Sequence, residues 1–548
     1  MKLSGLFVAV ILLALFGSAG RAQEMHTHTH GSPEKLGRVS FTVSCNPAAQ
    51  KQFNRATALL HSFWYEEAEK AFTALAKAEP NCAMAYWGVA MSYYHPVWAP
   101  ATATELHKGW AAVETAKSIR SVTERERDYV AAIEVFYRDA DKLNHFKRAL
   151  AYEQAMEQLH LRYPKDNEAT IFYALALNGT AMATVPLDKS YAKQKKAAEL
   201  LNEVLFKEPQ HPGVAHYLIH SFDYPQLAHL ALRAARSYAK IAPSSPHALH
   251  MPSHIFTRLG LWQESINSNL ASAAAAKNHV AITHPGAASF DELHALDYLV
   301  YAHLQGGDDQ KARRILEQAN AVNGVDAAIF AAAYALAAIP ARYALERRSW
   351  SEAARLELRP TTFPWQQFRY AEAIIFFARA IGAARSGDTA SARKDLEKLS
   401  EIQKALAEAN NGYWANQVEI QRRGAAAWLA HAEGKHEEAL QLMRSAAHLE
   451  ASTEKHPVTP GPIIPAPELL GDMLIELNQP EQALMQFETS LQDSPNRFNG
   501  LYGAARAAQQ AGNRKKASSY YRRIVTLTAR ADSVRTELQK AKDFLAEK

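Results

Sequence analysis

The chain has 548 residues, of which 48% are hydrophobic and 21% are charged. This composition supplies enough apolar material for large buried cores and excludes an intrinsically disordered chain. With 61 Lys and Arg against 56 Asp and Glu, the formal net charge is only +5, and no long basic run is present. We therefore expect no nucleic-acid partner.

Residues 1–22 have the pattern of a secretory signal peptide. A lysine near the start is followed by an apolar run over residues 6–16, and the small residues Gly20 and Ala22 suit cleavage near Gln23. No later stretch reaches the roughly 20 apolar residues that a membrane-spanning helix needs. The sequence therefore predicts a protein without a membrane span, located in the periplasm or secreted.

The segment after the signal peptide, residues 23–44, precedes any apolar pattern, and we expect it to form a flexible tail. It contains alternating histidines in the run HTHTH, whose expected chemistry is adventitious metal capture. Cys45 and Cys82 follow, and they are the two cysteines of the chain. In an oxidising compartment they are expected to form a disulfide, because neither has the CxxC partner or nearby histidine of a thiolate metal site.

Small and aromatic residues recur at helical spacing from about residue 49 to about residue 530. In FNRATALLHSFWYEEAEKAFTALAKAEP, Ala56, Ala68, Phe72 and Pro80 follow the small, small, aromatic, proline order of a tetratricopeptide unit. The chain thus resembles the tetratricopeptide repeat family. This resemblance implies an all-α fold, a right-handed superhelical solenoid of helix-turn-helix repeats.

The segments HALHMPSHIF and HPVTPGPIIPAPELLGDML also resemble a group of secreted bacterial tetratricopeptide proteins, a likeness that covers most of the mature chain. It implies the fold and no particular activity. We expect partly degenerate repeats over residues 45–210, histidine-rich central repeats over 211–330, and further repeats with a capping helix over 331–548.

Three segments interrupt the repeat pattern. Residues 100–165 are helical in pattern but match the repeat poorly. Residues 276–289 are expected to form an overlong turn. Residues 455–468 form a proline-rich connection that contains His456 and could reach the central repeats if the solenoid curls far enough. Long loops in a compact solenoid are often functional.

Two histidine pairs, His216/His220 and His250/His254, recur 34 residues apart, which is one repeat period. Pro212 and Pro246 each suit the first turn of a helix. Counted from these prolines, both pairs take the fifth and ninth positions of their units. Residues four apart share one helix face and can chelate one ion.

The next unit extends this set. Gly307 and Ala312 fix its register, and Ser289 with Glu292 forms a predicted capping box at its start. Tetratricopeptide proteins line their concave groove with the second, fifth, ninth and twelfth residues of each first helix. The resemblance therefore implies one groove-facing set, with these candidate metal ligands: His216, His220, His247, His250, His254, His294 and Asp297.

Imidazole and carboxylate ligands without thiolate favour a divalent transition metal, above all zinc, iron or copper(II). Asp223, Arg258 and Tyr301 are candidates for orienting the ligands or for binding a ligand of the protein. Further along, Arg342 and Glu346 suit either the clamping of an anion or an internal ion pair. Other histidines, such as His61 and His448, are expected to be packed or solvated side chains.

Three hypotheses follow for the function. The first is a solenoid that binds a divalent metal in its groove and through it a protein, a peptide or a small anionic ligand. The second is a metal-dependent hydrolase or oxidoreductase that uses the same cluster. The third is a metal-free scaffold for protein partners. No P-loop, Rossmann glycine pattern, GxSxG or HExxH motif occurs in the sequence.

Overall fold

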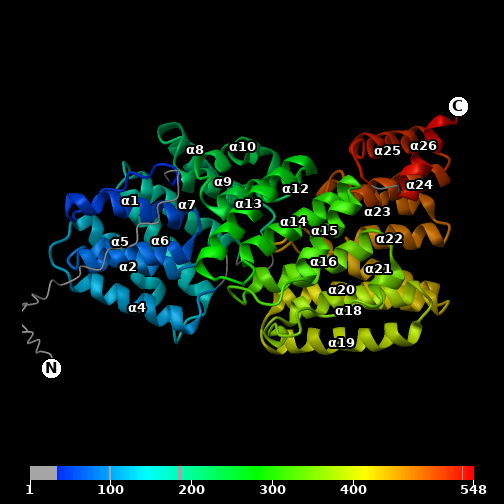
Figure 1. Ribbon diagram of the computed structural model, residues 1–548, viewed down its shortest axis with the longest axis horizontal. Coiled ribbons are helices and arrows are strands. Elements are labelled where there is room, and N and C mark those ends of the chain that lie inside the picture. The colour runs from blue at the N-terminus through cyan, green and yellow to red at the C-terminus, as the bar shows by residue number, and fades with distance from the viewer. Residues whose placement is uncertain (1–33, 98–99, 183–187, 533–534, 548) are drawn as a thin grey trace, which may run out of the picture. The chain divides into compact units, whose positions relative to one another are not determined.

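The computed structural model describes residues 34–97, 100–182, 188–532 and 535–547. Throughout these residues the secondary structure is helical, and no strand occurs apart from one isolated bridge between Ala288 and Val325. Consecutive helices pack against each other as hairpins, for example α18 with α19 and α19 with α20 (Figure 1). The predicted all-α solenoid of tetratricopeptide-type helix-turn-helix repeats is confirmed.

The helices of the first part of the chain are α1 (Pro47–His61), α2 (Tyr65–Ala78), α3 (Ala83–Tyr93), α4 (Ala103–Ser118), α5 (Glu124–Tyr137), α6 (His145–Arg162), α7 (Asn167–Met182) and α8 (Ala192–Lys207). Those of the central part are α9 (Pro212–Phe222), η1 (Ala228–Ala231), α10 (Leu232–Ile241), α11 (Pro246–His250), α12 (Pro252–Arg258), α13 (Trp262–Thr283), α14 (Phe290–Gly306) and α15 (Asp309–Asn320). The remaining helices are α16 (Phe330–Glu346), α17 (Trp350–Ala353), η2 (Trp365–Gln367), α18 (Arg369–Arg385), α19 (Thr389–Glu408), α20 (Gly412–Ala432), α21 (His436–Ala451), α22 (Ala466–Glu476), α23 (Pro480–Asp493), α24 (Phe498–Gln510), α25 (Arg514–Leu527) and α26 (Thr536–Ala546).

The small and aromatic residues of the repeat pattern pack as a tetratricopeptide unit requires. Phe72 of α2 lies directly against Gly88 of α3, where an added Cβ would come within 2.2 Å of the ring. Phe487 of α23 lies in the same way against Gly471 and Gly503 of the two neighbouring helices. Side chains at these glycines would push the helices apart, so the small residues set the spacing between units.

Two of the three irregular segments agree with expectation, and one does not. Residues 100–165 contain the helices α4, α5 and α6, and residues 452–465 contain no helix. The prediction of an overlong turn over residues 276–289 is wrong, because α13 continues beyond the alanine-rich run SAAAAK to Thr283. Ala276 and Val280, four residues apart on α13, are both buried, and this packing of one helix face favours the further turns.

The described end of the expected flexible tail is buried. Leu36, Val39 and Val43 are buried and Phe41 is fully enclosed by neighbouring helices. The backbone N–H of Arg38 donates to the carbonyl oxygen of Gln210, at 2.9 Å. The sequence pattern was too short to reveal this packing, and residues 23–33 lie outside the described residues.

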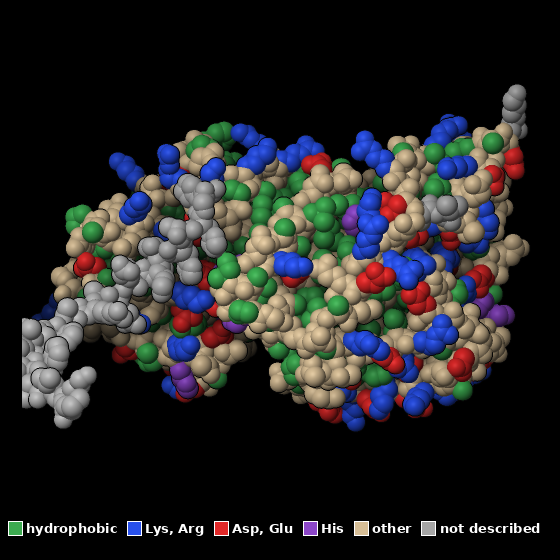
Figure 2. Space-filling view, in the orientation of Figure 1, with side chains coloured by type: hydrophobic (Ala, Val, Ile, Leu, Met, Phe, Trp, Pro, Cys, Tyr) green, Lys and Arg blue, Asp and Glu red, His purple; other side chains and the backbone are tan. Residues whose placement is uncertain are grey.

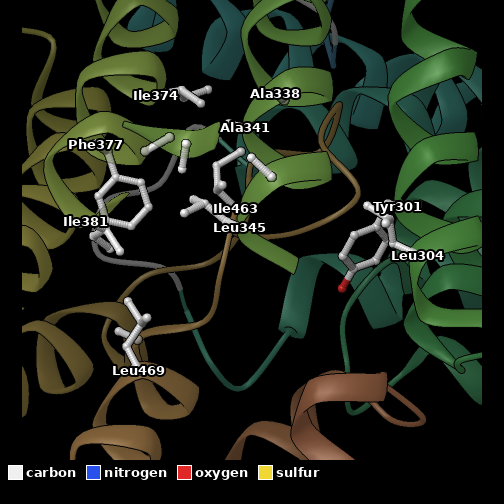
Figure 3. Close-up of a cluster of buried hydrophobic side chains, with 14 of the residues drawn as sticks. Tyr301, Leu304, Ala338, Ala341, Leu345, Ile374, Phe377, Ile381, Ile463 and Leu469 are labelled. Atoms are coloured by element: carbon white, nitrogen blue, oxygen red, sulfur yellow. The ribbon is translucent and has the colours of Figure 1, made fainter. Parts of the chain in front are cut away.

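The buried apolar side chains form two clusters, and the boundary between them falls between α12 and α13. One cluster extends from Leu36 to Phe256 and the other from Trp262 to Phe544. The proline-rich connection contributes to the second cluster, because Ile463 lies beside Ala341 and Leu345 of α16 (Figure 3). This contact fixes the connection against the repeats instead of leaving it as a free loop.

No helix among the described residues is long and apolar enough to cross a bilayer. On the face shown in Figure 2, basic and acidic side chains are interspersed and form no extended patch of one sign. This distribution agrees with the nearly balanced charge of the whole chain.

The predicted disulfide is present between Cys45 and Cys82, whose Cα atoms are 5.1 Å apart. It ties the segment before α1 to the start of α3 and closes a loop with a sequence separation of 37 residues. We expect the double variant Cys45→Ser/Cys82→Ser to lose about 2 to 4 kcal/mol of unfolding free energy, because the cross-link restricts the unfolded chain. Urea unfolding checks this, with dithiothreitol-reduced wild type as the matched control. Equal stability of oxidised and reduced protein would contradict the prediction.

Candidate metal centre

The candidate ligands lie on four central helices. His216 and His220 are on α9, His247 and His250 on α11, His254 on α12, and His294 on α14. All six side chains are buried. The predicted prolines begin their helices, since Pro212 and Pro246 occupy the first turns of α9 and α11.

The expected single helix after Pro246 is in fact divided at Met251. Pro252 has no N–H to continue the hydrogen-bond ladder, so α11 ends and α12 begins there. The break does not separate the histidine pair, because the Nε2 atoms of His250 and His254 are 3.0 Å apart.

Each ring of this pair is held from behind by a hydrogen-bond acceptor. The Nδ1–H of His250 donates to Oδ1 of Asn269, at 2.6 Å, and the Nδ1–H of His254 donates to Oδ2 of Asp223, at 3.0 Å. The amide of Asn269 has a defined orientation, since its Nδ2 donates to the carbonyl oxygen of Ser265. In the neutral rings both Nε2 atoms therefore carry lone pairs, and these face each other.

His294 completes a group of three with this pair. Its ring centroid lies 4.2 Å from that of His250, and one ligand atom of each residue lies within 4.8 Å of the other two. Burial is the main cause that lowers the pKa of His250, His254 and His294 below the usual value. The three imidazoles are thus neutral near pH 7, the protonation state in which histidine binds metal. We call these three residues triad B.

The remaining three histidines form a second group, which we call triad A. The Nε2 atom of His216 lies 3.0 Å from Nε2 of His220 and 3.2 Å from Nε2 of His247. The Nδ1–H of His216 donates to the carbonyl oxygen of His61, at 2.7 Å, so the Nε2 lone pair of His216 faces the other two rings. Burial lowers the pKa of His216 to about 3.

A third group, which the sequence did not indicate, supports triad A. The carboxylate of Glu168 accepts hydrogen bonds from Nε2 of His61 and from Nε2 of His211, both at 2.9 Å. The hydroxyl group of Tyr217 lies 2.9 Å from Nδ1 of His61. These bonds fix His61, whose carbonyl oxygen orients His216. His61 is a packed side chain, as expected.

Asp223 connects triad B to the proline-rich connection. Besides His254, its carboxylate accepts from Nε of Arg258 and from Nζ of Lys455, each at 2.9 Å. Arg258 also donates to Glu454, at 2.7 Å. The two buried cations hold the pKa of Asp223 well below its usual range despite its burial. Two cations and two carboxylates balance each other, so the surroundings add no net charge to the histidines.

A cavity of about 520 Å³ opens beside this network. Its polar wall includes His220, Asp223 and Lys455, and its aromatic wall includes Tyr413 and Trp414. The proline-rich connection therefore does reach the histidine region, through Lys455. Burial lowers the pKa of this lysine to about 8.

Three further candidates have other partners. Asp297 accepts from Nε of Arg342, at 2.9 Å, and is absent from the groups whose ligand atoms converge. Tyr301 accepts a hydrogen bond from Arg497, at 2.8 Å. Glu346 also pairs with Arg497. The internal ion-pair alternative for Arg342 and Glu346 is the one that the structure contains.

Sequence analysis missed Asn269, Glu168, His211 and Lys455 as members of the network around the histidines. Asn269 is on the second helix of its hairpin and Glu168 is on α7, so no fixed spacing connects them to the histidines. His211 had one usable signal, its position directly before Pro212 at the start of α9. The signal for Lys455 was its place in an unusually long connection.

No family model and no curated protein sequence matches the chain. Among solved structures, the chain is similar to the Cut9–Hcn1 hetero-tetramer of the APC/C, with 12% identity over 91% of this chain and 89% of that chain and a TM-score of 0.28. Yeast Tom70 has 11% identity over 91% and 95% of the two chains, with a TM-score of 0.33. The human IFIT1 dimer with m7Gppp-AAAA has 10% identity over 82% and 90%, with a TM-score of 0.36. At such values these alignments add nothing to the repeat assignment, which rests on the helix hairpins and glycine contacts of this chain.

Because Asp297 pairs with Arg342, a substitution at Asp297 should change the stability of the protein and leave metal binding unchanged. We expect Asp297→Ala to lower the free energy of unfolding by about 3 kcal/mol, because Arg342 would stay buried without its counter-ion. The affinity for zinc, measured by competition with a chromophoric chelator, should stay within twofold of wild type. A tenfold loss of affinity in the folded variant would instead assign Asp297 to the ligands.

Proposed function

We propose that this protein binds a divalent transition metal ion through His250, His254 and His294, in the groove of its helical repeats, and holds a ligand or partner through that ion. The observation that carries the proposal is the pair of facing Nε2 atoms of His250 and His254, 3.0 Å apart. Both rings donate from Nδ1, so neither Nε2 has a proton to offer the other. The two Nε2 lone pairs therefore repel each other, and a cation between them removes this repulsion.

The spacing of these atoms suits a bound ion. Ligand nitrogens at about 2.0 to 2.1 Å from a tetrahedral zinc ion lie about 3.3 to 3.4 Å from each other. The pair at 3.0 Å needs only a small adjustment to reach this separation. The buried carboxylate of Asp223 behind His254 is the arrangement that orients a metal-bound imidazole and raises its basicity.

The nature of the ligand atoms limits the ion. Three imidazoles without thiolate favour zinc, iron or copper(II) over copper(I) and iron–sulfur clusters. Because burial keeps the rings neutral, protons compete weakly with a metal near pH 7.

Export to the periplasm or the exterior is part of the same proposal and rests on the sequence of residues 1–22, which lie outside the described residues. The Cys45–Cys82 disulfide supports it, because disulfides persist mainly in oxidising compartments.

A metal-dependent enzyme is the second candidate function. The observation that favours it is the cavity of about 520 Å³ beside the histidines, because it offers space for a small substrate. Three histidines leave a coordination position for water or substrate, as in catalytic zinc sites. Hydrolysis and oxidation are both compatible with this geometry.

Metal analysis of the purified mature protein tests the first proposal. We expect zinc or another transition metal to remain bound after dialysis and to raise the midpoint of thermal unfolding, because an ion that binds only the folded state stabilises it. His250→Ala and His254→Ala should each weaken binding at least tenfold. His448→Ala, at an exposed position of α21, is the matched control and should bind as wild type does. Absence of metal, with unchanged stability in both variants, would favour a metal-free scaffold.

Exogenous anions test whether the ion has an open position. In cobalt(II)-substituted protein, azide should shift the visible absorption bands, because an anion that enters the coordination sphere changes its geometry. A closed structural site would give the same spectrum with and without azide. That result would remove the enzyme from consideration and leave metal binding intact.

A further inference from the structure

The six buried histidines offer more ligand atoms than one ion can use. A tetrahedral site takes four ligands, and a catalytic one takes three from the protein. The two triads lie on different sets of helices. Triad A has two residues on α9 and one on α11, and triad B has one each on α11, α12 and α14. We infer that triad A, formed by His216, His220 and His247, binds a second divalent transition metal ion. This inference rests on the proposed ion at triad B.

Hydrogen bonds alone do not account for the contacts within triad A. His216 has one Nε2 lone pair, because its Nδ1–H is engaged with the carbonyl oxygen of His61. Two nitrogens, from His220 and His247, approach this Nε2 at 3.0 and 3.2 Å. A single lone pair accepts one good hydrogen bond, so at most one of these two contacts is a hydrogen bond. A metal ion accepts a lone pair from all three Nε2 atoms at once, with His220 and His247 in the tautomer that is protonated at Nδ1.

The spacing in triad A supports the same conclusion. The distances of 3.0 and 3.2 Å are close to the separation of about 3.3 to 3.4 Å between nitrogen ligands of a tetrahedral ion. His61, held by Glu168 and Tyr217, orients His216 through its carbonyl oxygen. This is the type of buried support behind a ligand that fixes the ring and the tautomer.

The group formed by His61, Glu168 and His211 is not a third ion site by the same criterion. Its two imidazole nitrogens each lie 2.9 Å from a separate carboxylate oxygen of Glu168. Each of these contacts is an ordinary hydrogen bond from N–H to carboxylate, so the group needs no cation. Its part is to position His216.

The two ions would lie side by side. The ring centroids of His220 and His254 are 6.4 Å apart, and those of His247 and His250 are 6.3 Å apart, so rings of one triad border rings of the other. Of the six histidines, His220 alone lines the neighbouring cavity. The second ion is therefore the one nearer the cavity, and a small anionic ligand entering there would meet it first.

Metal stoichiometry of the full-length mature protein tests this inference. The protein is loaded with zinc or cobalt(II), dialysed, and analysed by mass spectrometry of the elements against a protein concentration from amino-acid analysis. We expect two ions per wild-type chain. His216→Ala and His247→Ala should each retain one ion, as should His294→Ala in the other triad. His448→Ala should retain two.

Each outcome discriminates between the two proposals. One ion per wild-type chain overturns the second site and leaves the proposed function intact, whereas no ion overturns both. Loss of both ions from a folded His216→Ala variant also overturns the inference, because the triads would then not hold separate ions. Circular dichroism identifies variants that fail to fold. One ion per wild-type chain decides against the second site even where variants fail to fold.

In cobalt(II)-loaded protein the second site also has a spectroscopic test. Azide should perturb the bands of wild type and of His294→Ala, which retains the ion of triad A. It should shift the bands of His216→Ala only at higher azide concentration, because that variant retains the ion farther from the cavity. The reverse pattern overturns the placement of the second ion beside the cavity.

Discussion

The burial of six neutral imidazoles at the junction of two apolar clusters is the constraint on which the central part of the molecule depends. Along the chain, one cluster ends at Phe256 and the other begins at Trp262. The histidines lie on helices that border this division. Buried polar atoms must be satisfied, because each one left without a partner costs about 1 to 3 kcal/mol. The partners come from distant helices, and this requirement holds the repeats in one register.

Asp223 meets a large part of that requirement. Its carboxylate orients His254 and neutralises two buried cations, Arg258 and Lys455. Lys455 belongs to the proline-rich connection, whose Ile463 is embedded against α16 (Figure 3). The connection is thereby anchored at both ends, by an ion pair and by an apolar contact. The same segment forms one wall of the cavity beside the histidines, so Asp223 holds part of that wall in place through Lys455.

Further along the chain, buried ion pairs connect neighbouring helices in place of histidine contacts. Asp297 pairs with Arg342, and Arg497 pairs with both Glu346 and Glu468. These charges are buried, and removal of one partner costs more than the pair contributes, because the remaining charge stays buried without a counter-ion. A repeat protein of this kind can thus keep one backbone arrangement and bury a cluster of histidines in one region and structural ion pairs in another.

The sequence by itself determined the repeat architecture, the disulfide and the two HxxxH pairs, because each depends on local spacing: helical periodicity, a repeat of 34 residues, and residues four apart on one face. The addition of His247 and His294 also followed from register. Only the tertiary structure decided that Asp297 turns to Arg342, that His250 and His254 are held by Asn269 and Asp223, and that Lys455 reaches Asp223 from 232 residues away. Those choices are contacts between helices and loops remote in the chain. Local spacing carries no information about them, because the partner that a buried side chain finds depends on which elements pack beside it.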